Sequence, residues 1–201
     1  AAIAGPKSRD MLSKLYPDLD VSNDALPFMG YKEAEFFGVP SRIFRISFSG
    51  ELAYEINVKS DHGMFMWEKM MEVGKEFGNQ PYGTEALSTL RIEMGHVAGP
   101  ELDGRTIPSD VSLNGLVSKK KDFIGKNSLG REAFNVESRQ KIVGLIPIDR
   151  KSSIPEGSHI VQDQNAKLPN PKLGHVSSSC WSVENNNPFS LAIMKDGKNM
   201  I

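Results

Sequence analysis

The chain has 201 residues and a formal net charge of −1, with 39% hydrophobic and 24% charged residues. These values are typical of one large or two small globular domains, and the absence of a basic excess argues against nucleic-acid binding. No apolar run approaches the roughly 20 residues of a membrane span, and the first residues lack the features of a signal peptide. We therefore expect a cytoplasmic protein with no membrane and no nucleic-acid partner.

The cysteine and histidine residues of the sequence indicate the redox compartment and bear on metal binding. Cys180 is the single cysteine, so it cannot form an internal disulfide or build a thiolate metal site. The histidines are far apart in the sequence and show no metal-ligand spacing. The sequence therefore predicts a reducing compartment and no metal centre.

The first 58 residues predict a strand and two helices, followed by further strands. The chain opens on the end of a strand, as if it were a piece of a longer protein, and Gly5-Pro6 begins a helix that stops at Pro17. A short second helix is expected over residues 22–26. Residues 39–58 are rich in β-branched and aromatic residues and predict strands. Within them, Leu52, Tyr54, Ile56 and Val58 alternate with Ala53, Glu55 and Asn57 on the opposite face.

Two amphipathic helices are expected next. Residues 60–78 carry Met66 and Met70 at helical spacing with Trp67 beside them, and all three are predicted to pack in the core. The other helix runs from its candidate N-cap, Thr84, to a stop at Gly95.

The predicted secondary structure changes near residues 135–140, from loops and a small helix to short strands. Residues 96–137 are rich in loops, with a small helix expected over residues 126–134. Four short strands separated by turn residues then predict a small antiparallel barrel or sandwich: residues 141–148, 158–163, 174–182 and 189–195. We expect an α+β fold with one domain over residues 1–137, itself incomplete at its N-terminal side, and a β domain, possibly truncated, over residues 138–201.

Common catalytic motifs are absent from the sequence, and Glu55 stands out instead. There is no dinucleotide-binding glycine motif, no P-loop and no nucleophile elbow. A charged residue within a strand commonly faces solvent, which is one interpretation of Glu55. In the other, the strand face lines a ligand cavity, where two carboxylate oxygens accept hydrogen bonds from a flat ligand with adjacent N–H donors, such as a pterin.

Four segments together resemble one protein family, in order and over nearly the whole chain. They read RIFRISFSGELAYEINV, YGTEALSTLRIEMGH, GPELDGRTIPSDVSLNGLVSKKKDFIGKNSL and GHVSSSCWS. They resemble the C-terminal region of the alpha subunit of heterotetrameric sarcosine oxidases, which belongs to the tetrahydrofolate-binding aminomethyltransferase (glycine cleavage T-protein) family. The resemblance implies a folate-binding α/β unit followed by a small C-terminal β-barrel.

The resemblance also implies site residues. It assigns tetrahydrofolate binding to Glu55, Tyr54 and Phe48, whereas the family's catalytic aspartate falls upstream of this chain. The family's arginine contact with folate aligns with Leu87 and is not carried over. Arg91 matches a motif position, and we expect it to form a structural ion pair.

The implied reaction converts the imine from sarcosine oxidation into glycine and 5,10-methylenetetrahydrofolate. FAD, FMN and NAD would lie in other parts of the enzyme, and the beta, gamma and delta subunits would be the partners. The chain alone is expected to be inactive. Two alternatives stay open: a stand-alone aminomethyltransferase, and a non-catalytic interaction module of the same fold.

Overall fold

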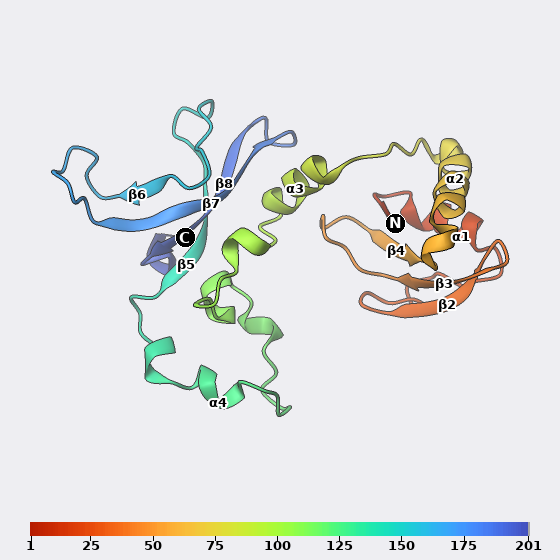
Figure 1. Ribbon diagram of the computed structural model, residues 1–201, viewed down its shortest axis with the longest axis horizontal. Helices are drawn as coiled ribbons and strands as arrows, with labels where there is room; N and C mark the ends of the chain where they lie inside the picture. Colours follow the sequence, from red (N-terminus) through yellow and green to blue (C-terminus); the bar gives the residue numbers. More distant parts are fainter. Residues whose placement is uncertain (201) are drawn as a thin grey trace. The chain divides into compact units, whose positions relative to one another are not determined.

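The computed structural model describes residues 1–200, which pack as two compact units divided between Leu87 and Ser88. Each unit contains a four-stranded antiparallel sheet, and helices accompany both sheets (Figure 1). The predicted α+β class is confirmed. The domain boundary expected between residues 137 and 138 is a different division and stays a prediction; strand β5 begins just beyond it, at Gln140.

The sheet of the first unit has the order β1-β4-β3-β2. Its strands are β1 (Ala2–Ala4), β2 (Tyr31–Phe36), β3 (Val39–Phe44) and β4 (Ala53–Asn57). Strand β2 was not predicted, and the strand signal over residues 39–58 resolves into β3 and β4 with a loop between them. Tyr54 and Ile56 of β4 are fully buried, while Glu55 between them is only partly buried. The predicted alternation of faces along β4 is confirmed.

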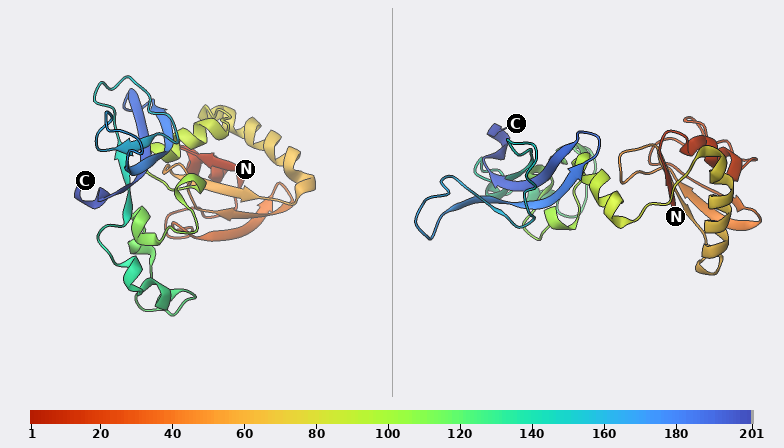
Figure 2. Two further views of the ribbon diagram at one scale, coloured as in Figure 1. Left: turned by 60° about the vertical axis from the view of Figure 1, so that its left-hand side comes forward. Right: turned by 90° about the horizontal axis from the view of Figure 1, so that it is seen from above.

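Two helices cover one face of this sheet, as Figures 1 and 2 show: α1 (Ser8–Leu15) and α2 (Gly63–Gly74). The core that they form with the strands includes Leu12, Leu15, Phe36, Ile43, Tyr54, Ile56, Met66 and Met70. Met66 and Met70 pack as predicted, but Trp67 is 45% exposed, so its predicted place in the core is wrong. Trp67 lies beside the buried stripe of α2 and not within it. Residues 22–26 form a hydrogen-bonded turn and not the expected helix.

The second unit contains the four strands predicted in the C-terminal part. They are β5 (Gln140–Leu145), β6 (His159–Val161), β7 (Lys172–Ser182) and β8 (Asn187–Lys195), in the order β5-β8-β7-β6. Within residues 1–200, no pairing between β5 and β6 closes this sheet, so an antiparallel sheet is present but the expected barrel is not confirmed.

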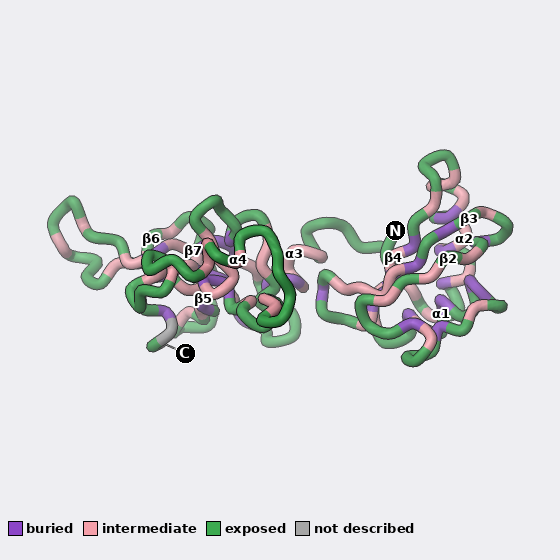
Figure 3. Tube along the Cα trace, turned by 90° about the horizontal axis from the view of Figure 1, so that it is seen from below, coloured by how far each residue is buried: buried purple, intermediate pink, exposed green. Residues whose placement is uncertain are grey.

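The remaining helices are short or lie near the division between the units. α3 (Thr84–Glu93) has Thr84, the expected N-cap, as its first helical residue, and α4 (Lys126–Leu129) falls where a small helix was expected. The 3-10 helices are Ser60–His62, Lys75–Phe77, Gly99–Glu101, Pro108–Val111, Asn114–Leu116, Glu132–Phe134 and Gly197–Met200. Figure 3 shows buried segments inside each unit. No helix among the described residues is long and apolar enough to cross a membrane.

Candidate functional site

Glu55 lies on the face of the first sheet that α1 and α2 do not cover. Antiparallel partners standing directly opposite each other place their side chains on the same face. Glu55 pairs with Ala2 of β1 on one side and with Phe44 of β3 on the other, and Phe44 pairs in turn with Tyr31 of β2. The register therefore sets Ala2, Glu55, Phe44 and Tyr31 in one row across the uncovered face.

Two aromatic rings stand in this row beside the carboxylate. The rings of Tyr31 and Phe44 are stacked, with centroids 5.8 Å apart and an interplanar angle of 25°. Tyr31 is 62% exposed, and Phe44 is partly buried. The next row on the same face is polar, with Asn57, Arg42 and Glu33 in register. The row that contains Glu55 thus lies between this polar row and the apolar pair Ala4 and Ala53.

Two recesses lie near this row, although Glu55, Phe44 and Tyr31 line neither of them. One, of about 650 Å³, is lined by Glu33, Arg42 and Asn57 of the neighbouring polar row, among other residues. Another, of about 660 Å³, lies where the edge of β1 faces α2, and Ala2, Trp67 and Met70 are among its lining residues. The recess on the polar part of the uncovered face therefore begins one row away from Glu55.

The structure separates Glu55 from one of the other two residues predicted to bind folate. Tyr54 points to the opposite face of β4 and is fully buried in the core under α1. Phe48 is 40% exposed in the loop between β3 and β4. The binding roles of Glu55, Tyr54 and Phe48 stay predictions, but only Glu55 lies on the uncovered face of the sheet itself.

The Tyr54 side chain has an unusual buried environment. Its hydroxyl makes no hydrogen bond within the described part of the chain, and the Arg9 guanidinium lies 5.9 Å from the centre of its ring. Burial raises the pKa of the Tyr54 phenol, and the positive charges of Arg9 and Arg45 oppose that rise. The phenol therefore stays neutral, and the Tyr54 ring packs in the hydrophobic core of the first unit.

Arg91 forms a buried ion pair in the second unit. Its guanidinium lies 2.9 Å from Oε2 of Glu101 and donates a second hydrogen bond of 2.7 Å to the hydroxyl of Ser178. Ser178 in turn donates to Glu101 Oε1 at 2.5 Å, and the Ala98 amide donates to Oε2 at 2.9 Å. Burial disfavours the Glu101 charge, but the hydrogen bonds from Ser178 and Ala98 outweigh it and hold its pKa below the ordinary value. The ion pair predicted for Arg91 is confirmed.

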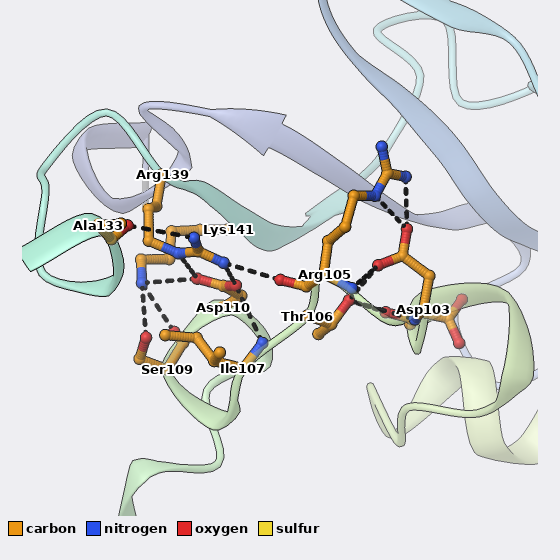
Figure 4. Close-up of polar contacts among 10 residues, drawn as sticks. Asp103, Arg105, Thr106, Ile107, Ser109, Asp110, Ala133, Arg139 and Lys141 are labelled. Atoms are coloured by element: carbon orange, nitrogen blue, oxygen red, sulfur yellow. Dashed lines mark hydrogen bonds and ion pairs between the residues drawn. The ribbon is translucent and has the colours of Figure 1, made fainter. Parts of the chain in front are cut away.

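A second charged cluster joins the loop region to β5 (Figure 4). Asp110 accepts hydrogen bonds from two nitrogens of Arg139 and lies 3.4 Å from the ammonium of Lys141. The amide of Ile107 donates to the same carboxylate at 3.1 Å. Although burial disfavours its charge, the contact with Arg139 keeps the pKa of Asp110 below its ordinary value. Because each charge in the cluster already has a partner, we interpret the cluster as structural.

Metal and thiol chemistry find little support among the described residues. Within residues 1–200, no group of three His, Cys, Asp or Glu side chains is placed to hold a metal ion. Cys180 is a partly buried free thiol in β7, and burial, followed by the charge of Glu93, raises its pKa. A thiol with a raised pKa is a weak nucleophile at neutral pH.

The sequence did not reveal the aromatic neighbours of Glu55. Tyr31 lies in YKEAEF, whose charged residues mask its strand character, and Phe44 gains its place only through the pairing of β3 with β4. A signal in the sequence was the alternation of Glu33 and Glu35 with the apolar Ala34 and Phe36, which matches the burial pattern of β2.

Comparison with known proteins identifies relatives of this chain. The alpha subunit of sarcosine oxidase from Corynebacterium sp. (strain P-1) is 42% identical over 100% of this chain, and the match covers 21% of that protein. The alpha subunit from Rhizobium meliloti (strain 1021) is also 42% identical, over 98% of this chain. The aminomethyltransferase of Chloroherpeton thalassium (strain ATCC 35110 / GB-78) is 32% identical, over 96% of this chain and 51% of its own length. The chain thus spans about a fifth of its sarcosine oxidase relatives.

A solved structure shares the fold. The crystal structure of the glycine cleavage system aminomethyltransferase T from Bartonella henselae matches with a TM-score of 0.74 at 23% identity, over 98% of this chain and 51% of that one. The family model described as the GCVT N-terminal domain matches residues 1–121, which is more than half of the sequence. The chain therefore belongs to the GCVT N-terminal domain family.

Proposed function

We propose that this chain is the tetrahydrofolate-binding part of a sarcosine oxidase alpha subunit. The 42% identity with sarcosine oxidase alpha subunits over the full chain supports this assignment above that of a stand-alone aminomethyltransferase, for which the identity is 32%. In the full-length protein, the substrate would be sarcosine, and the products would be glycine and 5,10-methylenetetrahydrofolate. The small C-terminal barrel implied by the resemblance remains a proposal for that longer protein.

The observation that carries this proposal is the place of Glu55. Glu55 stands on the uncovered face of the sheet, one row from the recess lined by Arg42 and Asn57. A pterin ring presents N3–H and a 2-amino group side by side, and a carboxylate offers two acceptor oxygens at matching spacing. The residues present therefore fit the pterin ring of tetrahydrofolate.

The chain's own residues would bind and orient the folate. When bound, tetrahydrofolate supplies the nitrogens that take up the one-carbon unit. Glu55 would fix the pterin ring through two hydrogen bonds, and such positioning lowers the entropic part of a reaction barrier by as much as about 7–11 kcal/mol in favourable cases. The group that moves the proton would belong to a segment outside this chain.

Other components of the enzyme would complete the reaction. FAD, FMN and NAD would bind to other domains or subunits, and the beta, gamma and delta subunits would be partners. The match to about a fifth of the alpha subunits' length supports the view that further domains are needed. The isolated chain would not oxidise sarcosine.

Replacing Glu55 with glutamine in the full-length protein tests the proposal. The amide keeps one acceptor oxygen and turns an NH2 group toward the second pterin donor, which should weaken tetrahydrofolate binding by about 2–4 kcal/mol. Calorimetric titration measures this loss. Flavin reduction by sarcosine should continue, and the product should shift from methylenetetrahydrofolate to free formaldehyde.

A matched control is available in the same segment. Glu51 is an exposed carboxylate in the loop before β4, so Glu51→Gln removes one negative charge without touching the sheet face. It should leave folate affinity unchanged. Equal affinities for wild type and Glu55→Gln would return Glu55 to a solvent-facing role and refute the site.

A further inference from the structure

The stacked aromatic pair beside Glu55 has no role in the core. The core of the first unit lies under α1 and α2, on the other face of the sheet, and neither Tyr31 nor Phe44 belongs to it. Tyr31 leaves most of its surface in water, although an exposed aromatic ring forgoes the gain of burying apolar area. A binding function would account for two stacked rings held on a wet face.

The register sets how far these rings lie from the carboxylate. Neighbouring strands are about 4.8 Å apart, so Phe44 stands about 5 Å and Tyr31 about 10 Å from Glu55 along the row. A two-ring heterocycle whose N–H edge meets Glu55 extends away from the carboxylate over a comparable length. On the other side of Glu55 the row ends in the methyl group of Ala2, which offers little surface to stack on.

We propose that Tyr31 and Phe44 form an aromatic platform on which the two-ring part of the folate stacks while Glu55 holds its N–H edge. The proposal rests on the proposed function and adds two specificity-determining residues to it. Offset stacking favours flat, electron-rich bicyclic rings of this kind. The recess lined by Glu33, Arg42 and Asn57 begins at the next row, so the remainder of the ligand has space to leave the platform.

Leucine substitutions in the full-length protein test the platform. Tyr31→Leu and Phe44→Leu keep an apolar side chain but remove the ring, and each should weaken tetrahydrofolate binding about five- to fiftyfold, the effect of losing one stacked ring. Tyr31→Phe keeps the ring and should bind like the wild type. Thermal melting should show that Tyr31→Leu folds normally, since the side chain is largely exposed.

Phe37→Leu provides the matched control. Phe37 is also an exposed ring of the β2–β3 hairpin, but Lys69 of α2 lies 5.6 Å from its centre, which places it on the helix-covered side. Its replacement should leave folate affinity unchanged. A second probe, 6-methyltetrahydropterin, lacks the tail of folate and should show the same loss with Tyr31→Leu, because the platform contacts only the two-ring part.

The outcomes separate this proposal from the proposed function. Weaker binding by Glu55→Gln and by both leucine variants supports both. Weaker binding by Glu55→Gln alone, with the leucine variants at wild-type affinity for both probes, overturns the platform and leaves the folate site in place. Absence of folate binding by the wild-type protein overturns both.

Discussion

Removing the positive charge of the buried ion pair should destabilise the second unit strongly. In Arg91→Met, the carboxylate of Glu101 would keep its hydrogen bonds from Ser178 and Ala98 but lose its countercharge. The two side chains of the ion pair are only 6% and 0% exposed, so water cannot replace the lost contact. Breaking a buried pair on one side costs about 3–5 kcal/mol, and we expect a loss of unfolding free energy in this range.

A double replacement distinguishes loss of pairing from loss of packing. Arg91→Met combined with Glu101→Leu removes both charges and leaves apolar side chains of similar size. The double variant should be destabilised by less than the sum of the two single variants, with a coupling of up to about 3 kcal/mol. Arg91→Met leaves a buried carboxylate without its partner, and Glu101→Leu leaves a buried guanidinium without its partner. The double variant contains neither unpaired charge.

Urea unfolding followed by tryptophan fluorescence measures these changes in the unfolding free energy of the second unit. The chain has two tryptophans, Trp67 in the first unit and Trp181 in the same strand as Ser178. In a Trp67→Phe background, Trp181 alone reports on the second unit. A loss below about 1 kcal/mol for Arg91→Met, as at surface positions, would refute the view that this pair is desolvated and structural.

Three further predictions follow from burial, close contacts and charge. Phe36→Ala should cost about 3–5 kcal/mol of unfolding free energy because the ring is fully buried, whereas Trp67→Ala should cost clearly less; equal losses in urea unfolding would contradict the exposure of Trp67. Gly174→Ala would place its Cβ 2.2 Å from the carbonyl oxygen of Ile193, and we expect a loss of about 3 kcal/mol or more, seen as a lowered melting temperature. The pKa of Asp110 is lower in the folded chain than its ordinary value of 3.8, so its stabilising contribution is present above that pH and is lost as the pH falls further; Asp110→Asn should flatten this acid dependence in melting curves recorded from pH 6 to pH 2.

The sequence predicted those features that depend on neighbouring residues. Period-two alternation placed Tyr54 and Ile56 in the core and Glu55 on the other face, and helical spacing placed Met66 and Met70 on the buried side of α2. The four C-terminal strands were found from their β-branched residues and the turns between them. These patterns arise from the local geometry of strands and helices, which the sequence displays directly.

Features set by pairing between distant segments were missed. Trp67 is next in sequence to the buried residues of α2. Only the way in which α2 packs on the sheet determines that the Trp67 ring stays partly exposed to solvent. Strand β2 is rich in charged residues because its outer face is wet, and propensity alone does not identify it. The row of Tyr31, Phe44 and Glu55 depends on the register of three strands, which no single segment encodes.

The ion pair of the second unit has a consequence for the synthesis of the chain. Arg91 and Ser178 are separated by 87 positions in the sequence. During translation, Arg91 is therefore synthesised long before β7, the strand that contains Ser178. Until β7 emerges, the carboxylate of Glu101 remains hydrated, and the second unit lacks the hydroxyl that bridges both charges. Nascent chains arrested before residue 172 should therefore expose this segment to proteases, and protection should begin only once β7 and β8 have left the exit tunnel.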